Sequence, residues 1–470
     1  MKTFGSWRPA AWFFIVILLL SSTPASGGLF DSLSIEKEKQ IGEEFFLEIQ
    51  NFYTLATDPF VTSYINRLGR KLVGQLGSQP YTYRFFIIDE PTVNAMAVPG
   101  GYIFVTTGFI RSMEREGELA AVLAHEVSHV YARHLARQMD QAKGVNIISL
   151  VGGLAAVLVG GPAAAAILAG TQAAGMSAML SYSREHEQEA DSLGFKWMLK
   201  AGYNPRQMMS VFSKLNKQRW FQGGEVPIYL STHPHTDDRL VDLAHQISRH
   251  DSELPQKTDS PEFHYFALKV EATCGNPHQM FRRMTQASIR EPNNPVYLYG
   301  KALALGRLGR SPEAMATLQQ ALELQPDNII LQREIAAQHF ECNRYQEALP
   351  ILLRLQHRHP GDEVILYYLG RIYQERHQTD QALTAMERVQ SLNPAFVEVY
   401  HNLGTLYGEQ GRLGLAHYFL GLHSLRARAY PTALFHFKKA QVNMPASDPH
   451  YHDLRNQITR LEKMKVKSEQ

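Results

Sequence analysis

The chain has 470 residues and is 44% hydrophobic, so it is long enough for two or three folded domains and too apolar to be disordered. Its 47 basic and 45 acidic residues leave a formal net charge of +2. So small a charge provides no long-range field for gathering nucleic acid or anionic lipid. No nucleic-acid partner is therefore expected.

The first 27 residues have the three parts of a secretory signal peptide. Lys2 and Arg8 precede an uncharged run over residues 9–20, and the small residues Ala25 and Gly27 follow. The apolar run is short for a membrane span. We therefore expect cleavage near residue 28 and export of the mature chain to the periplasm, with an uncleaved anchor as the alternative.

Residues 102–106 are aromatic and β-branched, and they follow the pair Gly100 and Gly101, which allows a sharp entry into a strand. A strand is expected here. Its backbone could pair with an extended substrate, or the strand could simply lie in the core.

Residues 118–130 contain no glycine or proline and carry apolar residues at helical spacing, so one buried helix is expected. Within it, His125, Glu126 and His129 follow the pattern HExxH. Residues four apart lie about 40° apart around a helix, so both imidazoles face one point with the carboxylate beside them. This arrangement is typical of a zinc site with Glu126 as general base. His134 lies about 140° from His129 around the helix and is expected to make only local hydrogen bonds.

An uncharged segment follows over residues 144–183. Because the chain must return to the same metal, the segment can cross a membrane twice or not at all. Each half is short for a span, so we favour two helices that cover the site or touch a membrane peripherally over a spanning hairpin.

A catalytic zinc also needs a third protein ligand. The best candidate is Glu187, in a second helical stretch over residues 183–191. Asp191 lies one turn later on the same face, where it could accept the spare N–H of a ligating histidine and fix its tautomer. Glu185 and Glu189 point elsewhere and are expected to be solvated.

The HExxH motif followed at a distance by ExxxD, from Glu187 to Asp191, resembles the HtpX and CaaX prenyl protease family of zinc metallopeptidases. The resemblance covers residues 35–248 and implies hydrolysis of peptide bonds with one zinc ion per chain. It also likens residues 94–106 to the family's edge strand before the zinc helix. The substrate-binding residues implied in this way are Asn94, Ala95, Tyr102, Ile103 and Phe104.

Residues 232–239 contain His233 before a proline and, further on, Arg239, which resembles the family's histidine-proline element followed by arginine. His233 could stabilise the transition state, or it could occupy the open zinc position and hold the enzyme latent. A turn histidine without a catalytic role is the third alternative. Arg239 could bind the oxyanion or a structural carboxylate.

Four prolines recur every 34 residues in the C-terminal half, the period of a tetratricopeptide helix-turn-helix unit: Pro292, Pro326, Pro360 and Pro394. Small residues recur within each period where two helices cross, at Ala302, Ala314, Ala336, Ala348, Gly370 and Ala382. The next such proline, Pro445, comes one and a half periods later, so the helix after Gly411 is expected to serve two neighbouring units. Residues 265–292 look like a degenerate first unit with its turn at Gly275.

These stacked helices resemble the tetratricopeptide family, which implies a concave surface that binds proteins or peptides. The expected fold is an α+β zincin-like metalloprotease domain, mainly helical with a small sheet, followed by an all-α tetratricopeptide-repeat solenoid. Its expected divisions are a signal peptide at residues 1–27, the protease domain at 28–252, the repeats at 263–447 and a C-terminal helix or tail at 448–470. Cys274 and Cys342 lie two repeats apart, roughly 20 Å, so free thiols are expected.

The leading interpretation is an exported zinc endopeptidase that cleaves misfolded or stalled envelope proteins, with the repeats recruiting partners. The family resemblance implies outer-membrane β-barrel proteins and their assembly machinery as substrate and partner. The alternative is an exported tetratricopeptide scaffold or chaperone with an inactive or latent protease domain, and the intact HExxH motif argues against it. A third interpretation, a protease acting within the bilayer, depends on residues 144–183.

Overall fold

The computed structural model describes residues 33–50, 52–141, 153, 181–221, 228–234, 237–255, 260–427 and 429–468. The expected signal peptide and most of the uncharged segment 144–183 lie outside the described residues. Within those ranges, no helix combines the length and the hydropathy that crossing a membrane requires.

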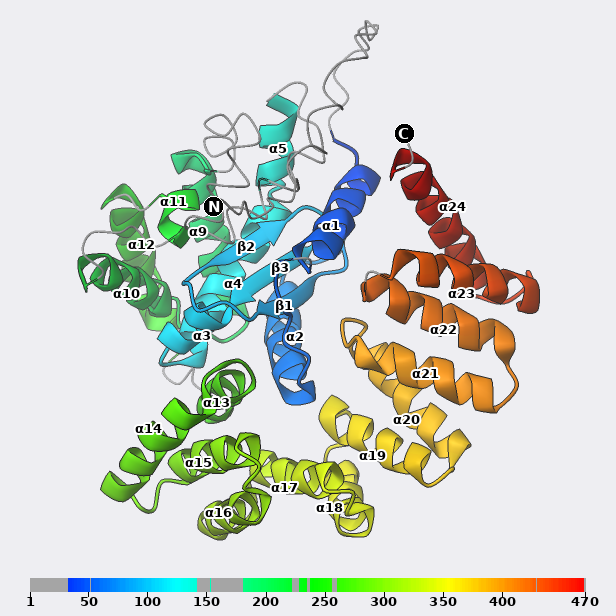
Figure 1. Ribbon diagram of the computed structural model, residues 1–470. Coiled ribbons are helices and arrows are strands. Elements are labelled where there is room, and N and C mark those ends of the chain that lie inside the picture. Colours follow the sequence, from blue (N-terminus) through cyan, green and yellow to red (C-terminus); the bar gives the residue numbers. More distant parts are fainter. Residues whose placement is uncertain are drawn as a thin grey trace, which may run out of the picture.

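A three-stranded sheet lies inside the N-terminal domain (Figure 1). It consists of β1 (Arg84–Ile88), β2 (Ala95–Val98) and β3 (Tyr102–Thr106) in the order β1-β3-β2, with β3 parallel to β1 and antiparallel to β2. Gly100 and Gly101 make the turn between β2 and β3 with φ angles of 84° and 92°, in the left-handed region that favours glycine. A Cβ atom on Gly100 would lie 2.9 Å from the carbonyl oxygen of Glu38, so glycine is also required for space.

The expectation that Tyr102, Ile103 and Phe104 belong to an edge strand is wrong, because β3 is the central strand. Its backbone already pairs with β1 on one side and β2 on the other. The edge on the side of β2 carries Ala95, with Asn94 just before it. Local composition predicts a strand at residues 102–106 but not the position of that strand in the sheet.

Helices pack on both faces of the sheet (Figure 1). Helix α1 (Ile35–Ile49) places Phe45 against Phe104 with ring centroids 5.3 Å apart, and α2 (Pro59–Val73) and α4 (Glu116–Tyr131) lie on the other side. Asp58 starts α2 by accepting the backbone N–H groups of residues 60 and 61. The other described elements of the domain are α3 (Thr107–Ser112), α5 (His134–Gln141), α9 (Arg184–Lys200), α10 (Arg206–Phe221), α11 (Ile228–Thr232), α12 (Asp237–Arg249) and the 3₁₀ turn η1 (Asp251–Glu253).

The C-terminal half is a solenoid of helix pairs, as the 34-residue period predicts. The expected small residues are buried at the helix crossings, and a Cβ atom on Gly370 would come within 2.9 Å of Met386 Cε. The first unit turns at Gly275, as expected. The helices are α13 (Glu262–Cys274), α14 (Pro277–Arg290), α15 (Pro295–Arg307), α16 (Ser311–Leu324), α17 (Ile329–Glu341), α18 (Tyr345–Arg358), α19 (Glu363–Glu375), α20 (Thr379–Leu392), α21 (Glu398–Glu409), α22 (Leu413–Arg426), α23 (Tyr430–Asn443) and α24 (Tyr451–Ser468).

Two finer expectations about the repeats are confirmed. Helix α22, which follows Gly411, packs against both α21 and α23 and so serves two neighbouring units. Cys274 and Cys342 are both free thiols.

The solenoid curves around the N-terminal domain (Figure 1). Phe266 of the first repeat stacks on Tyr64 of α2 with centroids 4.1 Å apart, and Arg70 Nη2 of α2 lies 2.6 Å from Glu363 Oε1 of α19. At the other end, Arg460 of α24 pairs with Glu43 of α1. The repeats therefore contact the N-terminal domain at both ends of the arc.

Candidate metal centre

Helix α4 supplies the two histidines of the HExxH motif. Its first fifteen residues are all buried, and its first turn is capped because the Glu118 carboxylate accepts the backbone N–H of the N-cap residue Arg115 at 3.3 Å. His125 and His129 lie one turn apart on the same face. Their Nε2 atoms are 3.0 Å apart, as the spacing of the motif requires.

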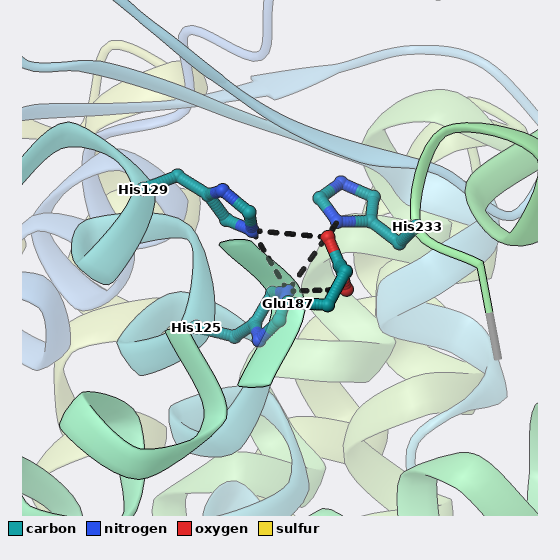
Figure 2. Close-up of side chains that lie close together, drawn as sticks. All are labelled: His125, His129, Glu187 and His233. Atoms are coloured by element: carbon teal, nitrogen blue, oxygen red, sulfur yellow. Dashed lines mark hydrogen bonds and ion pairs between the residues drawn. The ribbon is translucent and has the colours of Figure 1, made fainter. Parts of the chain in front are cut away.

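Glu187 from α9 and His233 from the segment after α11 meet these imidazoles (Figure 2). Glu187 Oε2 lies 3.4 Å from His125 Nε2, and its Oε1 lies 3.4 Å from His129 Nε2. His233 Nδ1 lies 2.9 Å from Glu187 Oε1 and 3.3 Å from His125 Nε2. One ligand atom from each of the four residues thus lies within 4.8 Å of all the others.

The donor set fits a tetrahedral zinc ion. Zinc bonds to imidazole nitrogen and carboxylate oxygen are about 2.0–2.2 Å, which places neighbouring ligands of a tetrahedron about 3.3–3.5 Å apart. The separations between 2.9 and 3.4 Å are close to these values. Two unprotonated nitrogens 3.0 Å apart would repel each other unless a cation or a proton lay between them. The site is therefore built for a positive charge at its centre.

Asp191 contacts the side chain of His125, and Arg239 contacts that of Glu187. Asp191 Oδ1 lies 3.0 Å from His125 Nδ1, and Arg239 binds both oxygens of Asp191 at 2.7 and 2.8 Å. Arg239 Nη1 also lies 2.6 Å from Glu187 Oε2. Of the two roles considered for Arg239, contact with structural carboxylates is the one that the structure displays.

The charges around these carboxylates offset the effect of their burial. Burial would raise the pKa of Glu187, but His233, His125 and Arg239 hold it well below its usual range. Burial would likewise raise the pKa of Asp191, and Arg239 is the main group that lowers it. Burial opposes protonation of His125, yet Glu187 and Asp191 raise its pKa to about 10. Protonation of His125 and binding of a metal ion at this nitrogen therefore compete.

His134 supports the second histidine. Its Nδ1 lies 2.8 Å from Nδ1 of His129, and its Nε2 lies 3.0 Å from Oε2 of Glu189. Burial lowers the pKa of His134 to about 4 despite this carboxylate, so the ring is neutral near pH 7. The sequence predicted that His134 makes local hydrogen bonds. The structure shows that one of these bonds is to His129, a residue of the metal centre. Glu185 and Glu189 are both exposed, as expected, and Glu189 also pairs with His134 and Arg137.

Two tyrosines that sequence reasoning missed hold the rings in place. Tyr182 stacks on His129 with centroids 3.9 Å apart, and Tyr229 stacks on His233 with centroids 4.4 Å apart. The backbone N–H of His233 donates to the carbonyl of Tyr229, which joins His233 to the end of α11. The sequence carried no signal for either tyrosine beyond its closeness to a motif.

Glu126 lies beside the donor set and is 0% exposed. Within the described part of the chain, neither of its carboxylate oxygens has a hydrogen-bond partner, and Oε1 is 3.6 Å from His233 Nε2. A buried carboxylate without a donor is costly, and such groups gather at catalytic sites. His125, His129, Glu187 and His233 are each at most 3% exposed, so the centre is closed to solvent in this structure.

Comparison with known proteins agrees with this geometry. Residues 59–247 match the family described as "Peptidase family M48", and residues 299–363 and 365–395 match tetratricopeptide repeats. The chain is 32% identical over 306 residues to the beta-barrel assembly-enhancing protease of Escherichia coli (strain K12), and 31% identical over 307 residues to that of Yersinia pestis. Each alignment covers 63% of this chain and 62% of the relative.

A more distant relative is the mitochondrial metalloendopeptidase OMA1 of Schizosaccharomyces pombe, which is 28% identical over 214 residues, or 45% of this chain and 61% of the relative. The chain spans somewhat less than two thirds of the length of each of these three curated relatives. The match to the M48 family contains every residue of the metal centre, and the repeat matches lie in the solenoid. The chain therefore contains a domain of peptidase family M48 followed by tetratricopeptide repeats.

Proposed function

We propose that this chain is a zinc-dependent endopeptidase whose active site is closed at rest. The observation that carries the proposal is the buried donor set of His125, His129 and Glu187, with the carboxylate of Glu126 next to it. Two neutral nitrogens and one carboxylate oxygen form a ligand set used by catalytic zinc sites. The match to peptidase family M48 supports the same chemistry.

His125, His129 and Glu187 would hold the ion, and zinc bound there supplies a Lewis acid that lowers the pKa of a coordinated water. Glu126 accepts a proton at its free carboxylate oxygen and later delivers it to the leaving amine. Asp191 and His134 fix the orientation of the two histidine rings through their Nδ1 atoms. The closed walls exclude bulk water, which strengthens each of these interactions.

A polypeptide substrate would pair with the free edge of β2. Among the described strands, β2 pairs only with β3, so its other edge offers backbone groups in the way that extended peptides are bound. Pairing through the backbone suits a protease that accepts many sequences. Residues 95–98 are between 1% and 7% exposed, so this edge must be uncovered before a substrate can reach it.

We further propose that the substrates are misfolded or stalled envelope proteins and that the repeats recruit partners from the machinery that assembles outer-membrane proteins. The names of the two bacterial relatives support a role in β-barrel assembly. A periplasmic location follows from the N-terminal sequence pattern of residues 1–27.

The test compares the mature chain with its Glu126→Gln variant for bound zinc and for hydrolysis of casein. The substitution keeps the ligands and removes the base, so both proteins should bind about one zinc, and casein hydrolysis should fall at least about 100-fold. Glu185→Gln makes the same change on the exposed side of α9 and should retain full activity. Equal and measurable hydrolysis by the parent and the Glu126→Gln variant would refute the protease proposal, whereas zinc binding without hydrolysis by either protein would indicate the latent state.

The closed centre also favours a second candidate, a tetratricopeptide scaffold or chaperone with a latent protease domain. Such a protein would bind zinc, cleave nothing as isolated and suppress the aggregation of unfolded proteins equally well with Glu126→Gln. If proteolysis appears only when His233 is replaced or a partner is added, the latent protein and the active protease are two states of one enzyme.

A further inference from the structure

A cavity of about 520 Å³ lies between the N-terminal domain and the last repeats. Its walls come from α1, β1 and β3 on one side and from α21, α22 and α24 on the other (Figure 1). No residue of the metal centre lines it. Tyr102 of β3 faces the cavity beside α1, whereas α4 carries the metal ligands on the other side of the sheet. The cavity is therefore separate from the active site.

Aromatic rings from both domains form much of the wall. Phe46, Phe86 and Tyr102 belong to the N-terminal domain, and their rings pack together with centroids between 4.6 and 6.2 Å apart. Tyr400 and Phe419 face them from the repeats. Rings arranged in this way favour a large apolar or aromatic side chain.

The charges in the wall leave two cations without acidic partners. Its two carboxylates are engaged, since Glu43 pairs with Arg460 and Asp453 accepts the hydroxyl of Tyr418 at 2.8 Å.

Arg84 and Arg426, one from each domain, instead lie over tyrosine rings, 5.2 Å from the centroid of Tyr102 and 3.9 Å from that of Tyr400. Within the described ranges, neither guanidinium forms an ion pair with a carboxylate. The guanidinium groups of these two arginines can therefore donate hydrogen bonds to an anion in the cavity.

Gln457 of α24, which carries an unsatisfied acceptor, also lines the cavity. The Oε1 atom of Gln457 is buried and has no hydrogen-bond partner in the part of the chain that the structure describes. A buried acceptor without a donor costs about 1–3 kcal/mol. If the Gln457 side chain rotates toward the cavity, the N–H of a peptide bond satisfies this oxygen, whereas a fatty acid carboxylate offers no donor.

We propose that this cavity binds an extended peptide segment of a partner protein, in which a carboxylate lies beside a large apolar side chain. The rings take the apolar side chain, Arg84 and Arg426 take the carboxylate, and Gln457 accepts a backbone N–H. A peptide of two or three residues matches the volume, which is within the usual range of ligand sites. Because the walls come from both domains, the bound segment also holds the repeats against the N-terminal domain.

Fluorescence anisotropy with a labelled hexapeptide of alternating glutamate and phenylalanine tests the proposal. The full mature chain carrying Glu126→Gln is used, so that the result does not depend on proteolysis. The double change Arg84→Gln and Arg426→Gln should raise the Kd of the peptide at least about tenfold, since it removes two charge-assisted contacts. Arg388→Gln, an exposed arginine on α20, is the matched control and should leave the Kd unchanged.

A change in the peptide and a change at Gln457 test which groups of the cavity contact the peptide. Replacing glutamate by glutamine in the peptide should weaken its binding to the parent chain but not to the double variant, because the lost contact is already absent there. Gln457→Leu, which leaves both arginine contacts intact, should raise the Kd about threefold or more. It also provides a test if the double variant fails to fold, which circular dichroism would detect.

An unchanged Kd in both Gln457→Leu and the folded double variant overturns the proposal. So does binding of the glutamine peptide as tightly as the glutamate peptide. If dodecanoate binds through Arg84 and Arg426 while the hexapeptide does not bind, the cavity is a site for a fatty acid and the peptide assignment is wrong.

Discussion

His233 Nδ1 lies 2.9 Å from Glu187 Oε1, so a residue from the segment after α11 occupies a fourth position among the groups that would hold the metal. A catalytic zinc site needs that position for water or substrate. Since the His233 ring is 2% exposed and stacked on Tyr229, it is held in place firmly. The geometry favours a residue that blocks the site over one that assists catalysis.

His233→Ala should therefore raise the rate of casein hydrolysis by the purified chain. The expected rise is at least about tenfold, which corresponds to about 1.4 kcal/mol. His245→Ala, on the exposed side of α12, is the control for loss of a histidine nearby and should have no effect. A lower rate in His233→Ala would show instead that the imidazole assists the transition state, and an unchanged rate would exclude both roles.

Asp191→Asn should weaken zinc binding by about 10- to 100-fold, because the carboxylate that orients His125 becomes a neutral amide. Competition with a chromophoric chelator measures the affinity directly and needs no substrate. Asp238→Asn, an exposed residue on α12, serves as control. If Asp191→Asn binds zinc as tightly as the parent, the contact with His125 does not tune the metal site.

His134→Phe should weaken zinc binding about tenfold, because His129 loses the hydrogen-bond partner of its Nδ1 atom while the ring volume is kept. Glu189→Gln retains an acceptor for the Nε2 atom of His134 and should change the affinity much less. The order of the two variants is the test. A larger effect of Glu189→Gln would mean that charge at Glu189, rather than the position of His134, supports the metal.

The parts of this centre that the sequence reveals are those that one helix positions. HExxH places His125 and His129 on one face by helical geometry alone, and Glu187 with Asp191 repeats that logic on α9. The 34-residue period likewise reports contacts between neighbouring helices, so the repeats could be read without tertiary information.

The remaining features depend on contacts between distant segments. Strand composition identified residues 102–106 as β but could not say that β3 would lie between β1 and β2. Residue types also gave no sign that His134 would contact His129 or that Tyr182 would stack on it. The contact of the solenoid with the N-terminal domain was not anticipated, since its charged residues look like ordinary surface residues in the sequence.

One such contact is the buried ion cluster around Lys269. Its Nζ atom lies 2.8 Å from Glu334 of α17 and 3.5 Å from Asp58 at the start of α2, and the three side chains are between 6% and 15% exposed. Lys269→Met would leave two carboxylates near each other without their cation. We expect the free energy of unfolding, measured by thermal denaturation at the first transition, to fall by about 3–5 kcal/mol.

Lys438→Met is the matched control, because Lys438 pairs with Glu462 at 2.7 Å while both side chains are about half exposed, at 54% and 49%. Exposed pairs contribute about 0–1 kcal/mol, so its transition should hardly move. Similar losses in the two variants would show that the cluster around Lys269 does not tie the repeats to the N-terminal domain.

The last prediction concerns pH. Glu398, at the start of α21, has a buried Oε2 atom that lacks a hydrogen-bond partner among the described residues. Burial, with a smaller contribution from Asp58, raises its pKa to about 7 from its ordinary value of 4.5. The folded state therefore holds this proton more tightly than the unfolded state does. Stability from this group is fully present below about pH 4.5 and is lost as the pH rises through 7.

Glu398→Gln removes the ionisable group, so its benefit should appear only where Glu398 would be charged. Unfolding in urea at pH 8.5 should show the variant more stable than the parent by up to about 3 kcal/mol, the equivalent of the raised pKa. At pH 5 the two proteins should differ little. Glu323→Gln, on the exposed side of α16, should show no pH-dependent difference. A benefit of Glu398→Gln that is equal at both pH values would mean that packing, and not the charge of the carboxylate, limits stability at this position.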